Sequence, residues 1–146
     1  MDEILRMLEL AGQGFHCSQI LITLGLEAQG KQNPDVVRTM HGLAGGIGFC
    51  GDICGALTGG ACLLALYAGK GTPEEDDDPR LNLMISELLE WFTNEYAGCY
   101  GGIHCKEILN DDPRNQSARC PGIVTQTYDQ VKTLLLNNGF DLSESK

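Results

Sequence analysis

The sequence predicts an all-α fold: a single compact domain, residues 1–146, of five to seven helices around a central Gly/Ala-rich apolar helix. Apolar residues recur in every long segment at the i, i+3, i+4, i+7 spacing of an amphipathic helix. Helix start and stop signals lie between these segments, such as Asn33-Pro34-Asp35 at a start and Gly139 at an end. No segment shows the strict apolar–polar alternation that is typical of a strand.

The first half of the chain predicts three helices and a glycine-rich connector. The first two helices are expected over 2–11 and 16–29, and a third follows Asn33, which caps it, with proline at the first helical position. The inward faces of the first two are predicted as Ile4, Leu5, Leu8 and Ala11, and as Cys17, Ile20, Leu21 and Leu24. The stretch 42–51 lacks the lysine and spacing of a phosphate-binding loop, so we expect a flexible connector.

The second half predicts four further helices. The central apolar helix is expected over 52–68, where small residues allow close packing, and a short helix is expected over 104–109. An amphipathic helix spans 81–92, and the last helix is expected over 121–138, before Gly139. The predicted inward residues of these two are Leu81, Met84, Ile85, Leu88, Leu89 and Phe92, and Ile123, Val124, Tyr128, Val131, Leu134 and Leu135.

Composition narrows the classes of partner and compartment. The chain has 20 acidic and 10 basic side chains and a net charge of −10. This disfavours nucleic acid and anionic membrane surfaces, since phosphate contacts need clustered Lys and Arg. The N-terminus is acidic, unlike a signal peptide, and the longest apolar stretch, 53–69, is short for a membrane span. We therefore expect a soluble cytoplasmic protein, with a homo-oligomer left open.

Seven cysteines are the most informative feature of the chain. The cytosol keeps thiols reduced, and an odd number cannot all pair within one chain. Four of them follow a turn or glycine break, open a predicted helix and precede inward residues at i+3 and i+4. These four are Cys17, Cys54, Cys105 and Cys120, and we expect them to converge on one cluster.

A position at a helix N-terminus favours the thiolate, by roughly 0.3–1 kcal/mol and up to about 2 when partly buried, whereas burial of the thiol acts in the opposite direction. Cys120, placed at the N-cap before Pro121 and beside Arg119, is expected to be among the most acidic thiols. Cys50 is a candidate resolving thiol four residues before Cys54. Cys62 is expected to be a core hydrophobe with a raised pKa, and Cys99 is left unassigned.

These residues resemble the C-GCAxxG-C-C family, small helical proteins with four hallmark cysteines that are described as redox-active. The resemblance runs from about 14 to 138. Its cysteines fall on Cys17 in His16-Cys17-Ser18-Gln19, on Cys54 in Cys54-Gly55-Ala56-Leu57-Thr58-Gly59, on Cys105 and on Cys120. Ile53 stands where the family name has glycine, and Cys50, Cys62 and Cys99 lie outside the pattern.

Three functions remain open from the sequence. The first is a thiol redox protein or thiol–disulfide oxidoreductase, with a protein redox partner and no required cofactor, in which Cys17, Cys54, Cys105 and Cys120 react. The second is a zinc or iron–sulfur protein with the same four cysteines as ligands, although the local C-x-x-C spacing is absent. The third is a binding or scaffold module whose cysteines are buried hydrophobes.

Overall fold

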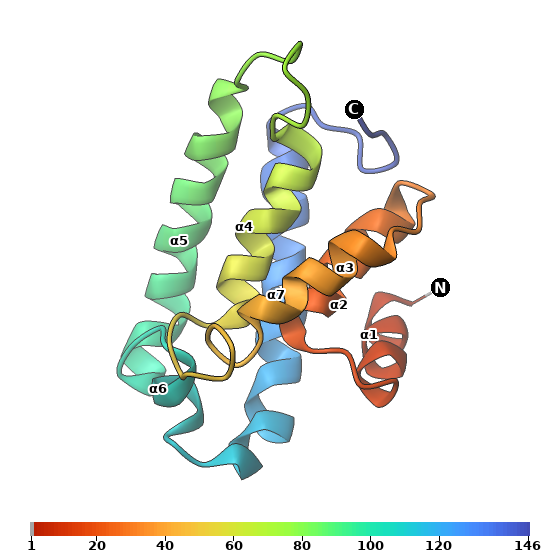
Figure 1. Cartoon of the computed structure of the whole chain (residues 1–146). Coiled ribbons are helices and arrows are strands. Elements are labelled where there is room, and N and C mark those ends of the chain that lie inside the picture. Colours follow the sequence, from red (N-terminus) through yellow and green to blue (C-terminus); the bar gives the residue numbers. More distant parts are fainter. Residues whose placement is uncertain (1) are drawn as a thin grey trace.

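The computed structural model describes residues 2–146, and its helices enclose one hydrophobic core (Figure 1). In these residues there are seven α-helices, two short 3-10 helices and no strand, apart from an isolated bridge between Ile53 and His104. The elements are α1 Glu3–Gly12, α2 Cys17–Ala28, α3 Pro34–Met40, η1 His41–Leu43, α4 Gly55–Ala68, α5 Pro79–Tyr100, α6 Cys105–Leu109, η2 Pro113–Asn115 and α7 Gln116–Asn137. The predicted all-α fold is confirmed.

The apolar helix α4 is central, as the sequence predicts, because it packs against α2, α5 and α7 (Figure 1). Its glycines allow this. A Cβ on Gly60 would lie 3.0 Å from Leu88 of α5 and 3.1 Å from Thr127 of α7. The sides of α5 and α7 that face α4 supply the rest of this core, where Phe92 of α5 and Val131 of α7 are fully buried.

Helix α1 departs from the prediction. Ile4, Leu5 and Leu8, expected to point inward, are 51, 60 and 55 % exposed, whereas Met7 and Leu10 are buried. The helix carries apolar residues on more than one side, and the structure packs the Met7–Leu10 side against the core. Ion pairs fix that orientation: Arg6 binds Glu27 of α2, and Lys132 of α7 binds Glu3.

The glycine-rich stretch before α4 is not the predicted flexible connector. Residues 45–49 all have positive φ, including Ile47 and Phe49, so the backbone makes a left-handed coil, visible below α3 in Figure 1. Its turns are closed by backbone hydrogen bonds from Gly48 N to Gly42 O, and from Asp52 N to Gly46 O. Left-handed backbone costs roughly 1–2 kcal/mol per non-glycine residue, so the backbone at Ile47 and Phe49 is strained. The hydrogen bonds hold this segment in one defined conformation.

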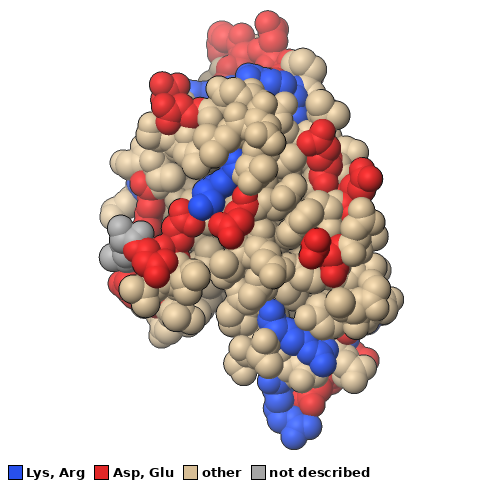
Figure 2. All heavy atoms as spheres, turned by 180° about the vertical axis from the view of Figure 1, so that it is seen from behind, with Lys and Arg blue, Asp and Glu red and all other residues tan. Residues whose placement is uncertain are grey.

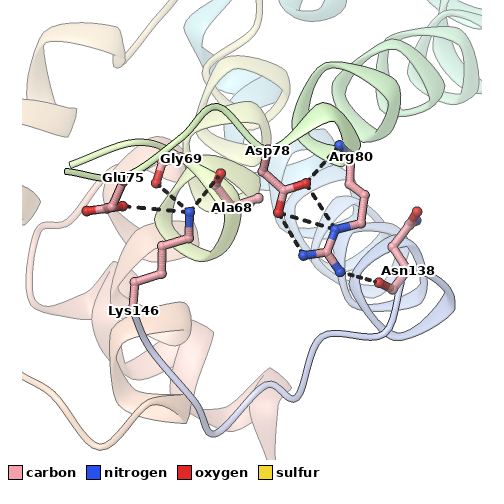
Figure 3. A network of polar contacts seen from close by, with 7 residues as sticks. All are labelled: Ala68, Gly69, Glu75, Asp78, Arg80, Asn138 and Lys146. Atoms are coloured by element: carbon pink, nitrogen blue, oxygen red, sulfur yellow. Dashed lines mark hydrogen bonds and ion pairs between the residues drawn. The ribbon is translucent and has the colours of Figure 1, made fainter. Parts of the chain in front are cut away.

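The opposite end of the molecule is held by polar contacts (Figure 3). Lys146 donates to the carbonyls of Ala68 and Gly69 at the end of α4. Arg80 binds the Asp78 carboxylate, which caps α5, and donates to the carbonyl of Asn138. Within residues 2–146, none of the helices combines the length and apolarity that a membrane span requires.

Candidate functional site: a cavity lined by five cysteines

One cavity of about 1040 Å³ opens where several helices begin. It lies between α1, the starts of α2 and α4, the left-handed coil, α6 and the start of α7. Figure 2 shows the surface recessed between α1 and the tip formed by η2 and the start of α7. The structure brings five sequence-predicted site residues to this cavity: Cys17, Cys50, Cys54, Cys105 and Cys120. None of them is bonded to another cysteine.

Cys17 is the first residue of α2, as predicted. The side chain of Gln19 accepts a hydrogen bond from the backbone N–H of His16, which caps the helix. Ser18 is fully buried and donates its hydroxyl to the carbonyl of Met40 at 2.8 Å. Both contacts fix the first turn of α2 and therefore the place of the Cys17 sulfur.

Cys54 is the N-cap residue of α4, and the glycines after it bring α4 against α2. A Cβ on Gly55 would lie 2.7 Å from the Cys17 sulfur, and one on Gly59 would lie 2.9 Å from the Cα of Ser18. Both distances are below ordinary contact. A side chain at position 59 would push against the backbone of α2, and one at position 55 would displace the Cys17 sulfur and lie 3.0 Å from the carbonyl oxygen of Leu43. The Cys-Gly-Ala-x-x-Gly pattern is therefore the packing condition that places Cys54 beside Cys17.

Cys105 reaches the cavity through backbone pairing with the segment before α4. The N–H of Cys54 donates to Ile103 O at 3.0 Å, and the N–H of Cys105 donates to Asp52 O at 2.6 Å. The ring of His104 lies between two carboxylates, with Nδ1 2.6 Å from Glu107 and Nε2 3.2 Å from Asp52. Glu107 also accepts from the His104 N–H, as Gln19 does from His16, so the Cys17 and Cys105 turns are built alike.

The predicted position of Cys120 at a helix N-cap is wrong. Helix α7 begins at Gln116, which places Cys120 in its fifth position and Pro121 inside the helix. The missed signal is Asp112-Pro113, the same cap-and-proline pair that opens α3 and α5, here starting η2, which runs into α7. Arg119 does not turn toward the thiol either, because its guanidinium donates to Ile108 O and lies 5.2 Å from the Tyr100 ring.

The predicted bias toward thiolate is also wrong for the buried cysteines. Burial, with a smaller contribution from neighbouring cysteines, raises the pKa of Cys17 to about 11 and those of Cys54 and Cys120 to about 12. The N–H groups of Ala56 and Leu57 lower the pKa of Cys54, but burial outweighs them. Burial raises the pKa of Cys105 too. These four sulfurs are therefore neutral thiols at neutral pH.

The remaining cysteines differ in place and exposure. Cys50 is exposed on the left-handed coil at the cavity mouth, while Cys99 is exposed on α5 outside the cavity. Cys62, also outside the cavity, is half-buried against the core in α4, and burial raises its pKa as predicted. The seven cysteines therefore differ mainly in solvent exposure: Cys50 and Cys99 are exposed, and the other five are buried or half-buried.

Side chains other than cysteine also line the cavity. His16 lies at the wall, with its ring 4.9 Å from that of His41 and 5.1 Å from that of Phe49, and burial lowers its pKa. Ile4 and Leu8, which sequence periodicity assigned to the core, instead line the mouth. The sequence carried their apolar character but no sign of which surface they would face.

The metal alternative gains no support from the arrangement of side chains. Among residues 2–146, no group of three or more His, Cys, Asp and Glu side chains is arranged to hold a metal ion. A zinc or iron–sulfur site on the four cysteines is thus not preformed in the described residues. It therefore stays a prediction from the sequence.

Comparison with known proteins bears on the same cysteines. The model of the family described as "Putative redox-active protein (C_GCAxxG_C_C)" matches residues 15–134, a range that includes all seven cysteines. No curated protein and no solved structure matches the chain significantly.

Proposed function

Because the chain belongs to the C_GCAxxG_C_C family, whose description suggests redox activity, we propose that it carries out dithiol–disulfide chemistry with its cavity cysteines. The reacting set is Cys17, Cys54, Cys105 and Cys120, with Cys50 as the accessible thiol. The observation that carries the proposal is convergence. Four cysteines that are distant in the sequence line one cavity, near enough for the charge of one to shift the pKa of another.

Raised thiol pKa values decide the order of events. The thiolate is the nucleophile in disulfide exchange, and a thiol of pKa about 12 is almost wholly protonated at pH 7. A buried thiol is therefore a poor first attacker on an incoming disulfide. Cys50, exposed at the mouth, is placed to make the first attack.

The exchange then balances in two steps with a disulfide-bearing partner protein. The Cys50 thiolate attacks one partner sulfur, so a mixed disulfide forms and the other partner sulfur leaves as a thiolate. A cavity thiol, Cys54 in this proposal, gives up its proton and attacks the Cys50 sulfur. A Cys50–Cys54 disulfide forms and the second partner sulfur leaves. One partner disulfide is reduced to two thiols, and two protein thiols are oxidised to one disulfide.

The strained coil supports this role for Cys50. Ile47 and Phe49 hold positive φ on either side of Gly48, immediately before Cys50. A disulfide at Cys50 needs the two Cα atoms within about 7 Å of each other, so the conformation of the coil decides which thiol can pair with Cys50. Strained backbone of this kind clusters at functional segments that change conformation.

The proposal is tested by oxidising the reduced protein with diamide, which accepts two electrons and two protons. Remaining thiols are blocked with N-ethylmaleimide and disulfides are located by peptide mass spectrometry. We expect intramolecular disulfides that include Cys54, and their loss in Cys54→Ser. The matched control, Cys62→Ser, changes a cysteine of the same helix outside the cavity and should leave the pattern intact. Disulfides that form only between molecules, through Cys50 or Cys99, would contradict the proposal.

A further inference from the structure

We propose that the cavity binds an uncharged, planar oxidant of the quinone class and passes two electrons to it from the cavity thiols. This inference rests on the proposed thiol chemistry and adds a small-molecule substrate to it. Three features of the cavity carry it: its size and walls, its mouth, and its charge.

The cavity has the size and lining of a small-molecule site. Its volume of about 1040 Å³ is at the upper end of the range for ligand pockets, roughly 300–1,000 Å³. Thiol sulfurs lie in the same lining as apolar walls. The apolar wall residues include Met7, Phe15, Ile20, Ala56, Ile123 and Val124.

The mouth exposes large apolar side chains that no core contact explains. Ile4 and Leu8 of α1 are 51 and 55 % exposed, and Phe49 of the coil is 59 % exposed. All three line the one cavity, although they come from separate segments of the chain. Apolar side chains gathered at an opening are typical of an entrance for an apolar ligand.

The charges of the cavity lining and of the whole chain indicate which class of two-electron oxidant can bind. Within the described lining, Lys106 is the one Lys or Arg side chain, and Asp111 and Asp112 lie on the same lining. The whole chain carries −10. Oxidised glutathione and the phosphate-bearing nicotinamide and flavin cofactors are anions, so this site repels them and offers no basic cluster for phosphate. An uncharged quinone ring meets apolar walls without that cost.

The reaction balances without another reagent. Two cavity thiols lose two electrons and two protons, and one S–S bond forms between their sulfurs. The two carbonyl oxygens of the quinone take up these electrons and protons, so the quinone becomes a hydroquinone.

The probe is duroquinone, whose four ring methyl groups block addition of a thiol to the ring. Reduced protein is mixed anaerobically with duroquinone or, separately, with diamide, and loss of thiols is followed against oxidant concentration. We expect the duroquinone rate to saturate. Leu8→Glu places a charge at the mouth and should lower the ratio of the duroquinone rate to the diamide rate by about tenfold. Leu5→Glu is the control, because Leu5 is 60 % exposed on the same helix but outside the cavity.

The outcomes separate this inference from the proposed function. A duroquinone rate that never saturates, or equal rate ratios in Leu8→Glu and Leu5→Glu, overturns the quinone site, while diamide oxidation of the cavity thiols still supports the thiol chemistry. Failure of both oxidants to form a cavity disulfide overturns the proposed function and the quinone reaction together. Saturation with a ratio lowered only in Leu8→Glu supports the inference.

Discussion

The sulfur of Cys17 lies against the backbone of Gly55, so closely that a Cβ at Gly55 would stand 2.7 Å from it. The same Cβ would lie 3.0 Å from the carbonyl oxygen of Leu43. This contact links the start of α2 to the start of α4, and through Cys54 it joins two of the proposed reacting thiols. Gly55, a glycine of the family pattern, is therefore required by packing, and its substitution can test that requirement.

Gly55→Ala should therefore destabilise the protein, although alanine favours helices. Overpacking of a tight contact costs about 1–3 kcal/mol. Gly98→Ala is the control, because Gly98 lies in α5 with open space around its Cα, and there alanine should stabilise by about 0.5–1 kcal/mol. Denaturant unfolding of the reduced proteins measures both changes. Equal effects of the two substitutions would show that the Gly55 contact is not constraining.

Accessibility should order the reactions of the seven thiols. With iodoacetamide at pH 8 and peptide mass spectrometry, we expect Cys50 and Cys99 to be modified first, because both are exposed. Cys54 and Cys120 should react slowest, since Cys54 is buried, Cys120 is half-buried and the pKa values of both are raised to about 12. Unfolding in guanidinium should abolish the difference. Modification of Cys120 before Cys50 in the native protein would restore the original expectation that Cys120 is an activated thiol.

The sequence predicted the helices and the inner face of α7 well, because periodic apolar residues decide a face when the other side is polar. In α2 the predicted inward residues Ile20, Leu21 and Leu24 are buried, but so are most other residues of the helix, because it is enclosed on several sides. The prediction failed for α1, where Met7 and Leu10 compete with Ile4 and Leu8, and only packing against α2 and α7 decides which pair is buried. It also failed for the start of α7, because Pro121 looked like a helix start. A proline early in a helix removes only one backbone donor, so α7 tolerates it.

The sequence predicted which cysteines share the site but not the direction of their pKa shifts. Four cysteines at predicted helix starts pointed to the residues that now line one cavity. The sign of their pKa shifts could not be read from helix ends, because a helix dipole lowers a thiol pKa by about one unit at best, whereas burial acts in the opposite direction and more strongly. Burial of Cys54 depends on α1, α6 and α7 closing around it, which no local pattern encodes.

Alanine substitution at two glycines of the left-handed coil should lower the stability of the protein by different amounts. A Cβ on Gly46 would lie 2.5 Å from both the N and O atoms of Asp52, whereas Gly48 has open space, and both residues have positive φ. Gly48→Ala should cost about 1–2 kcal/mol from its backbone conformation alone. Gly46→Ala should cost more and should slow diamide-driven disulfide formation, since Asp52 O holds the start of α6. Equal losses in the two variants would mean that the Asp52 contact does not set the cavity geometry.

The stability of the reduced protein should fall steeply at alkaline pH. Cys17, Cys54 and Cys120 have folded-state pKa values of about 11, 12 and 12, above the ordinary thiol value of 9.0. Well below pH 9 these thiols are neutral in both the folded and the unfolded protein, so they do not change the free energy of unfolding. As the pH rises from 9 toward 11, the unfolded chain ionises first and is favoured, by up to about 1.4 kcal/mol per thiol for each pH unit.

Anaerobic urea unfolding of the reduced protein at pH 8, 9, 10 and 11 measures this dependence, and the expected unfolding free energy declines above pH 9. Buried tyrosines such as Tyr128 also have raised pKa values and contribute at the upper end, so the comparison needs a variant that keeps them. Cys54→Ala and Cys120→Ala, singly and together, serve that purpose. Each removes one titrating thiol and should flatten the decline between pH 9 and 11, by an amount that adds in the double variant. A decline as steep in the double variant as in the wild type would mean that these sulfurs are not buried as neutral thiols.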